Sequence, residues 1–217
     1  MKTKFKHILV ILCLSMISCE GNLEPELFDQ ITPENFLTNE DDVKTAVTGV
    51  YAEFRGISEW GRYKTSWGSV MTLQEVPTDL WAANWFYKAH TDFMWKATDY
   101  FVCEIFEFFV PAITKATALI ARIQDAPVSD DIKNRYIAEL RAVRALWMYD
   151  LFDLYGPVPA ITDPEKILNP TQDFTVTRPS REEYITFVET ELKEVINAQI
   201  LPVAWTGSQR HHGFTIL

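Results

Sequence analysis

A segment rich in tryptophan and polar side chains, residues 75–90, offers the clearest chemistry in the sequence. Carbohydrate binding requires flat apolar surfaces for the C–H faces of sugar rings and planar polar groups for the hydroxyls. Indole rings supply the first, and carboxylate and amide groups supply the second. Four candidate binding residues combine these types: Asp79, Trp81, Asn84 and Trp85. We predict that they bind an oligosaccharide; the alternative is that the tryptophans pack in a core beneath helices.

Catalytic groups do not form a specific pattern. Glu75 and Asp79 would share a helix face at i and i+4 and could form the carboxylate pair of a glycoside hydrolase. However, 30 acidic residues make such pairs frequent by chance. The adjacent side chains of His211 and His212 point apart, so we expect no metal site there. Phosphate-binding glycine loops, Cys-x-x-Cys pairs and nucleophile-elbow motifs are absent from the sequence. The sequence therefore predicts a binding protein without a cofactor or metal, not an enzyme.

The N-terminal residues are typical of an export signal. Three lysines precede an apolar stretch, residues 8–17, which is shorter than the about 20 apolar residues of a membrane-spanning helix. Cys19 directly follows Ser18, as in a bacterial lipobox. We therefore expect that residues 1–18 are removed and that Cys19 is acylated. A plain secretory signal is the alternative.

Composition excludes one class of partner. The formal net charge is −10, and loss of the lysine-bearing signal would make the chain more acidic, which argues against nucleic-acid binding. Three cysteines are present. If Cys13 leaves with the signal and Cys19 carries lipid, Cys103 is the only thiol left and no intramolecular disulfide can form. Apolar neighbours predict that Cys103 is buried.

The elements that would position the tryptophan-rich segment are helices. Over residues 131–155, large side chains recur at steps of three and four and define one face of a long helix. Capping groups precede it at residues 129–131, and Gly156 followed by Pro157 ends it. A ridge of small side chains would let another helix approach closely: Ala138, Ala142 and Ala145.

Two helices are expected before the long helix over residues 131–155. An asparagine and three acids favour a capped helix over residues 40–54. A second helix is expected over 98–123 or 106–123, kinked or started at Pro111. Between the two, residues 60–95 show no clear periodicity and hold five of the seven tryptophans.

One helix is expected after the long helix over residues 131–155. Ser180 and Glu183 match a capping box for a helix that continues to about residue 200. Its apolar face would comprise Tyr184, Phe187, Val188, Leu192, Val195 and Ile196. An exposed loop over 161–177 would precede it. No stretch alternates regularly enough to predict a sheet, so the expected fold class is all-α, built from helical hairpins.

Two segments carry the motifs of a known family. Thr32–Tyr51 combines an Asn-Phe pair, a run of acids and Ala-Val-x-Gly-x-Tyr, and Ala138–Thr162 combines an Ala- and Arg-rich start, an aromatic run and a Gly-Pro-Val-Pro exit. Both resemble the SusD/RagB family of outer-membrane nutrient-binding lipoproteins. Within the second segment, we interpret Arg141, Arg144 and Asp150 as structural charges, not as ligand contacts.

The resemblance implies a tetratricopeptide-like helical-repeat body with irregular tryptophan-rich loops. It implies a signal peptide over 1–18, a tether and loop over 19–39, and a SusD-like N-terminal helical domain over 40–217 that lacks part of the family fold. The implied function is polysaccharide utilisation: a surface lipoprotein, anchored in the outer membrane through Cys19 and facing outward, binds glycans and delivers them to a SusC-like TonB-dependent transporter. A helical-repeat scaffold for outer-membrane assembly and an extracellular glycan hydrolase are the alternatives.

Overall fold

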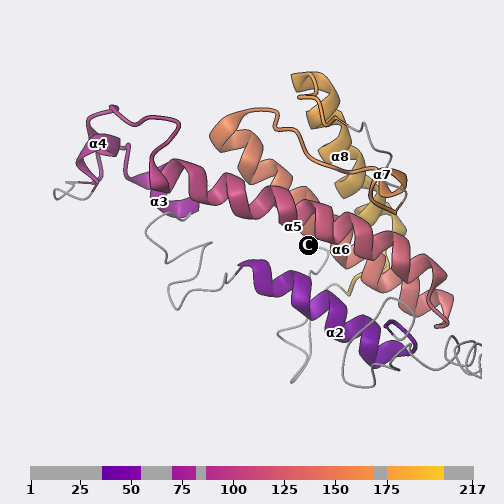
Figure 1. Cartoon of the computed structure of the whole chain (residues 1–217). Helices are drawn as coiled ribbons and strands as arrows, with labels where there is room; N and C mark the ends of the chain where they lie inside the picture. Colours follow the sequence, from indigo (N-terminus) through magenta and orange to yellow (C-terminus); the bar gives the residue numbers. More distant parts are fainter. Residues whose placement is uncertain (1–35, 55–69, 82–86, 169–174, 203–217) are drawn as a thin grey trace, which may run out of the picture. The chain divides into compact units, whose positions relative to one another are not determined.

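The computed structural model of this chain describes the following residues: 36–54, 70–81, 87–168 and 175–202. All regular secondary structure in these ranges is helical (Figure 1). The elements, in chain order, are α2 (Glu40–Tyr51), η1 (Ala52–Phe54), α3 (Val70–Glu75), α4 (Lys88–Thr91), α5 (Tyr100–Asp125), α6 (Asp130–Tyr155), α7 (Pro164–Leu168) and α8 (Arg181–Ala198). The predicted all-α class is therefore confirmed.

The chain divides into two compact units, Met1–Phe36 and Leu37–Leu217. Every helix named above belongs to the second unit, and its packing is described below. The predicted signal, residues 1–18, lies outside the described residues together with Cys19, so the predicted domain boundaries stay predictions. Within the described ranges, no helix is both long enough and apolar enough to cross a membrane.

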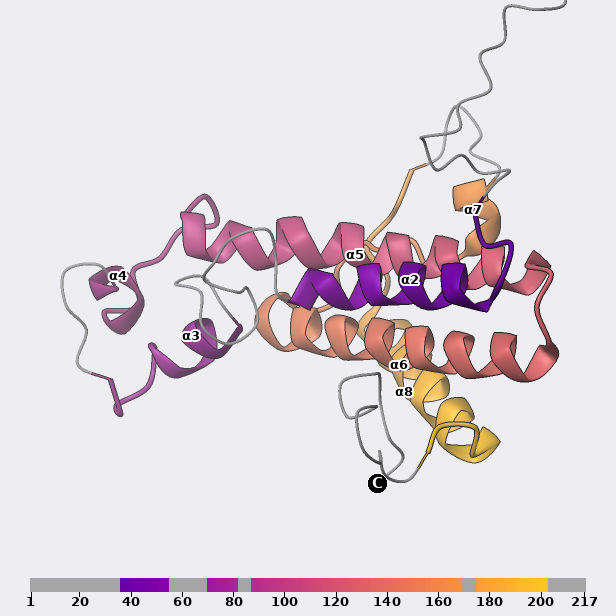
Figure 2. The same ribbon diagram turned by 90° about the horizontal axis from the view of Figure 1, so that it is seen from below.

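Helices α5 and α6 form an antiparallel hairpin at the centre of this unit (Figures 1 and 2). Each has 26 residues, and each presents a stripe of large apolar side chains to the other. The indole of Trp147 is completely buried between them, with ring centroids 5.0 Å from Phe54 and 5.9 Å from Phe109. Complete burial of one such side chain contributes about 1.5–3 kcal/mol to folding, so this contact is a main source of the hairpin's stability.

Helix α2 lies along the same hairpin and contacts both of its helices (Figure 2). The predicted asparagine cap is present, because Asn39 Oδ1 accepts the backbone N–H of Asp42 at 3.0 Å. Thr38 donates both its backbone N–H and its hydroxyl to the same carboxylate, which lowers the pKa of Asp42. Three buried residues at spacings of four and three form the inward stripe: Val43, Val47 and Val50.

Helix α5 is as long as the longer predicted range, 98–123, but lies two residues further along the chain. It begins at Tyr100 and continues through Pro111 to Asp125, so the expectation that the proline starts the main portion is wrong. A proline inside a helix costs about 3 kcal/mol. Burial of Phe109, Ala112 and Ile113 around it offsets that cost.

The thiol near the start of α5 also differs from expectation. Cys103 is only half-buried, and its Sγ donates to the carbonyl of Ala97 at 3.0 Å. The residue therefore acts as a partly exposed hydrogen-bond donor that ties the helix to the preceding turn, not as a fully buried thiol.

The C-terminal end of α6 follows the sequence prediction, whereas its N-terminal cap does not. Gly156 adopts φ 73° and ψ −161°, a conformation that glycine alone adopts readily, and its N–H donates to Phe152 O at 2.9 Å. At the other end Ser129 has an extended backbone, but its side chain makes no capping hydrogen bond. Only the charges of Asp130 and Asp131 remain to favour the helix dipole there.

The alanine ridge of α6 receives α8, as predicted. Ala138 and Ala142 form a buried cluster with Val195 and Leu201, and Ala145 is also fully buried. The small side chains let the two helices approach closely.

The start of α8 is fixed by the predicted capping box. Ser180 Oγ accepts the backbone N–H of Glu183 at 3.2 Å, and the Ser180 N–H donates to the Glu183 carboxylate at 2.8 Å.

The buried face of α8 is rotated from the predicted one. Its buried residues are Tyr184, Glu191 and Val195, whereas Leu192 is 38% exposed and Ile196 is 53% exposed. The reason is that Glu191, a charged residue, faces two arginines of α6. Sequence periodicity assigned the face by apolar residues alone and could not detect this pairing.

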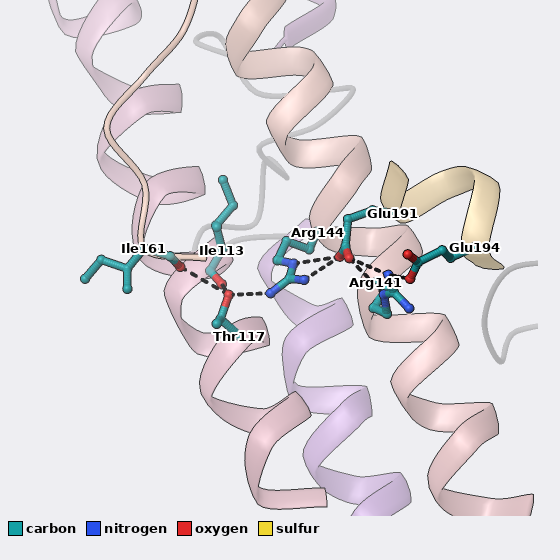
Figure 3. A network of polar contacts seen from close by, with 7 residues as sticks. All are labelled: Ile113, Thr117, Arg141, Arg144, Ile161, Glu191 and Glu194. Atoms are coloured by element: carbon teal, nitrogen blue, oxygen red, sulfur yellow. Dashed lines mark hydrogen bonds and ion pairs between the residues drawn. The ribbon is translucent and has the colours of Figure 1, made fainter. Parts of the chain in front are cut away.

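Figure 3 shows the polar network that joins these helices. Arg144 forms an ion pair with Glu191 and donates to the Thr117 hydroxyl of α5 at 2.8 Å. Arg141 donates to Glu191 at 2.9 Å and also pairs with Glu194. Arg144 is 5% exposed and Glu191 is 5% exposed, so each neutralises a charge that would be costly to bury alone. The interpretation of Arg141 and Arg144 as structural charges is confirmed; Asp150 is buried as well.

The segment after α6 was predicted as an exposed loop over 161–177, and this is wrong in part. Residues 164–168 form the short helix α7, which contacts α5. Pro164 is the first residue of α7, where a backbone N–H would have no acceptor within the helix, so the lack of an N–H in proline costs no hydrogen bond.

Candidate functional site

The predicted binding residues that the structure describes lie at the protein surface. Asp79 and Trp81 follow α3 in an irregular turn, and both are exposed, with Trp81 45% accessible. Asn84 and Trp85 lie outside the described residues. The structure therefore agrees with a surface position for Asp79 and Trp81, while the assembly of all four residues into one site stays a prediction.

Exposed aromatic side chains also follow α4, where the sequence reasoning singled out no residue. Phe93 is 67% exposed, Met94 is 72% exposed and Trp95 is 41% exposed, and we call these three residues the Trp95 surface. The Phe93 and Trp95 ring centroids are 5.6 Å apart. Contiguous exposed apolar side chains of this kind are typical of binding sites.

The backbone presents the Trp95 surface through an unusual turn. Phe93 has φ 57°, in the left-handed region that bulky residues rarely adopt. The turn is closed by a hydrogen bond from the Met94 N–H to Ala89 O at 2.7 Å, which ends α4. Strained backbone of this kind is concentrated at binding and catalytic sites, where it holds a side chain in position.

A cavity of about 350 Å³ lies beside Trp95. It is lined by Leu73, Pro77, His90, Trp95, Ala97, Val102, Leu154 and Tyr155. These residues come from α3 and its following turn, from α4 and the turn after it, and from the facing ends of α5 and α6. The size lies within the range of roughly 300–1,000 Å³ typical of sites for small organic ligands.

His90 and Tyr155 are the polar side chains of the cavity wall. His90 is 4% exposed and stacks on Trp95, with ring centroids 6.0 Å apart and an interplanar angle of 16°. Burial lowers the pKa of His90, although the charge of Asp99 opposes the shift, so the imidazole is neutral at neutral pH. The Tyr155 hydroxyl donates to Val102 O at 2.6 Å, and burial raises its pKa. Both groups are therefore uncharged polar groups at neutral pH.

Two hydrogen bonds hold the cavity walls together. Gln74 Nε2 of α3 donates to Asp153 Oδ2 of α6 at 2.8 Å. The bond from Tyr155 to Val102 joins α6 to α5. These two bonds tie the cavity walls to the central hairpin.

Two predictions about metal-binding and acidic side chains can be compared with the described residues. In the part of the chain that the structure describes, no group of three or more His, Cys, Asp and Glu side chains could hold a metal ion. Helix α3 ends at Glu75, and Thr78 N–H bonds to Glu75 O in the turn that follows. Glu75 and Asp79 therefore do not share a helix face, and the predicted i, i+4 geometry of a carboxylate pair is wrong. His211 and His212 lie outside the described residues.

Comparison with known proteins relates both the sequence and the fold to one group. SusD-like protein P38 of Formosa agariphila is 25% identical over 203 residues, which cover 88% of this chain and 37% of that protein. The crystal structure of a SusD-like carbohydrate-binding protein from Bacteroides fragilis matches with a TM-score of 0.64 and 20% identity, covering 83% of this chain and 35% of the other. The chain is therefore similar in sequence to a SusD-like protein and shares its fold with SusD-like structures.

Another SusD-like structure, of a laminarin-binding protein, matches with a TM-score of 0.55 and 21% identity over 81% of this chain and 36% of its own. No protein-family model matches the sequence. The chain spans about a third of the length of these SusD-like relatives. The SusD-like motif over residues 138–162 contributes the core of the central hairpin, whereas the Trp95 cavity only borders its end at Leu154 and Tyr155.

Proposed function

We propose that this chain forms part of a surface lipoprotein that binds oligosaccharides at the Trp95 surface and delivers them to a TonB-dependent transporter. The observation that carries the proposal is an exposed indole, Trp95, at an apolar cavity of about 350 Å³ with His90 and Tyr155 in its wall. An indole face can stack against the C–H face of a sugar ring, while neutral donors and acceptors bond to hydroxyls. Trp81 and Asp79, four and two residues beyond the cavity residue Pro77, supply a second indole and a carboxylate.

The ligand class is supported by the relatives. A SusD-like carbohydrate-binding protein and a laminarin-binding SusD-like protein share this fold. Laminari-oligosaccharides are therefore the first probes to use, followed by other neutral glucans. We propose binding without bond cleavage, so the oligosaccharide should be recovered intact after incubation, as chromatography of the mixture would show. Shortened products would instead favour the hydrolase alternative.

The binding test uses isothermal titration calorimetry with full-length protein. Trp95→Ala and Trp81→Ala should each weaken oligosaccharide binding by roughly tenfold or more, since each removes a stacking face. Tyr149→Ala is a suitable control, because Tyr149 is 56% exposed on α6 and does not line the cavity. Unchanged affinity in both tryptophan variants would reject this surface as the binding site.

Membrane attachment and the partner form a separate part of the proposal. The lipobox-like Ser18-Cys19 pair supports acylation of Cys19, which with several acyl chains would anchor the protein stably. Cys19→Ser should release the protein from the outer-membrane fraction, and mass spectrometry should find no lipid on it. Affinity purification of the native protein should recover a TonB-dependent barrel; recovery of assembly-machinery subunits alone would favour the scaffold alternative.

A further inference from the structure

A second cavity has a volume of about 260 Å³ and is lined by residues of α7, of the start of α8 and of the segments between α6 and α8. Its walls come from α6, the segment after α6, α7, residues 175–179 and the first turns of α8. The described residues that line it share no member with the Trp95 cavity. It is therefore a separate candidate site.

The walls of this second cavity are held by the central helices. Ile161 lines it, and the Ile161 carbonyl accepts a hydrogen bond from the Thr117 hydroxyl at 3.1 Å. Thr117 in turn accepts from Arg144, which pairs with Glu191 (Figure 3). On the α8 side, the hydroxyl of the lining residue Tyr184 donates to Met148 O at 2.9 Å. These contacts fix the cavity walls to the central helices, as in the largely pre-formed sites that bind most small molecules.

The base of the cavity is apolar and includes an aromatic ring. Val158 is completely buried and Met148 is 3% exposed. The half-buried ring of Phe187 lies beside them, with the Arg144 guanidinium 5.3 Å from its centroid. Because the guanidinium occupies one face of this ring, the other face is the one that can meet a ligand.

The polar side chains of the lining carry a small negative charge. Three are threonines, and the charged residues are Asp163, Lys166 and Glu183. Glu183 stays ionised because its hydrogen bonds with Ser180 lower its pKa. Two carboxylates and one ammonium disfavour an anionic ligand. A neutral ligand with hydroxyl groups can use all of these side chains. Its hydroxyls donate to the carboxylates, accept from the ammonium and bond in either direction to the threonine hydroxyls.

We propose that this second cavity binds one neutral sugar ring, independently of the Trp95 surface. Its volume is below the roughly 300–1,000 Å³ of sites for drug-sized ligands, which matches a single ring better than an extended chain. The ring would place its C–H face on Phe187 and direct its hydroxyls toward Thr162, Thr177 and Lys166. Such a site would hold the end of a glycan or a free monosaccharide.

The test is a protein-observed NMR titration of the full chain with D-glucose, D-galactose and D-mannose, each compared with D-glucuronate. At least one neutral sugar should shift the resonances of lining residues, and glucuronate should bind roughly fivefold more weakly than glucose because of the carboxylates. Thr177→Val, which removes a lining hydroxyl, should weaken binding roughly fivefold. Thr190→Val is the matched control, since Thr190 is an exposed threonine of α8 that does not line the cavity.

Two results would overturn this proposal. The first is that none of the three sugars shifts lining resonances at the highest concentration that solubility allows. The second is that Thr177→Val binds as the wild type does. Trp95→Ala should leave this titration unchanged, and loss of binding in that variant would contradict the independence of the two sites. If Trp81→Ala and Trp95→Ala do not weaken oligosaccharide binding, the proposed function is rejected. The proposal for the second cavity is then still decided by the sugar titrations of wild type and Thr177→Val.

Discussion

At the scale of single residues, two buried charges on α6 are compensated to different degrees. Arg144 meets a carboxylate, a hydroxyl and an aromatic ring. Glu139 is 2% exposed, accepts from the Tyr51 hydroxyl at 3.3 Å and lies 3.5 Å from Arg135 Nε. Burial raises the pKa of Glu139 despite these partners. Removal of the two charges should therefore change stability in opposite directions.

Arg144→Leu should destabilise the fold by about 3–5 kcal/mol, because it leaves the buried Glu191 carboxylate without its closest cation. Urea unfolding of the purified chain measures this loss. Arg141→Leu is the matched control: its side chain is 24% exposed and Glu191 keeps Arg144, so a smaller loss is expected. Equal losses in the two variants would contradict the central role of the Arg144–Glu191 pair.

Glu139→Gln should raise the melting temperature at pH 7. The folded-state pKa of Glu139 is above the unfolded value, so between the two values the folded state binds more protons and stability falls as pH rises. Glutamine cannot ionise and keeps an acceptor for Tyr51. The advantage of the variant should therefore disappear below about pH 4, where the carboxyl is protonated in both states. A variant less stable than wild type at pH 7 would show that the Arg135 contact outweighs burial.

At the scale of elements, Ser129 before α6 and Ser180 before α8 test which helix caps contribute to the stability of the fold. Ser180→Ala should cost about 1 kcal/mol, since it removes one half of the α8 capping box. Ser129→Ala at the start of α6 should change stability little, because the Ser129 side chain makes no capping bond. Chemical unfolding of both variants gives the comparison. A larger loss at position 129 than at 180 would contradict the observed geometry.

Two glycines give a second pair of opposite effects. Gly156→Ala should destabilise by about 1–3 kcal/mol, because φ 73° with ψ −161° is accessible almost only to glycine. Gly49→Ala, inside α2, should stabilise by about 0.5–1 kcal/mol, since the added methyl meets no atom within 4 Å and the helix gains propensity. Thermal unfolding measures both. Stabilisation by Gly156→Ala would show that the helix end is not held in this conformation.

At the scale of the whole molecule, the sequence predicted the elements whose signals are local. Periodicity and end signals located α2, α6 and α8, and the alanine ridge of α6 predicted the approach of α8. The short helices α3, α4 and α7 were missed because four to six residues carry too little periodicity.

The remaining differences depend on tertiary contacts. The face of α8 was misassigned because its burial is set by Arg144, which is 47 residues away. In the same way, the tryptophan-rich segment predicted a surface site at Asp79 and Trp81. It did not predict that Trp95 and His90 would meet residues of α3 and α6 at one cavity.

The most direct test is calorimetric titration of laminari-oligosaccharides into wild-type protein, Trp95→Ala and Tyr149→Ala. We predict that wild type and Tyr149→Ala bind with equal affinity and that Trp95→Ala binds roughly tenfold or more weakly. If Trp95→Ala binds as tightly as wild type does, the Trp95 surface is not where this protein holds its ligand.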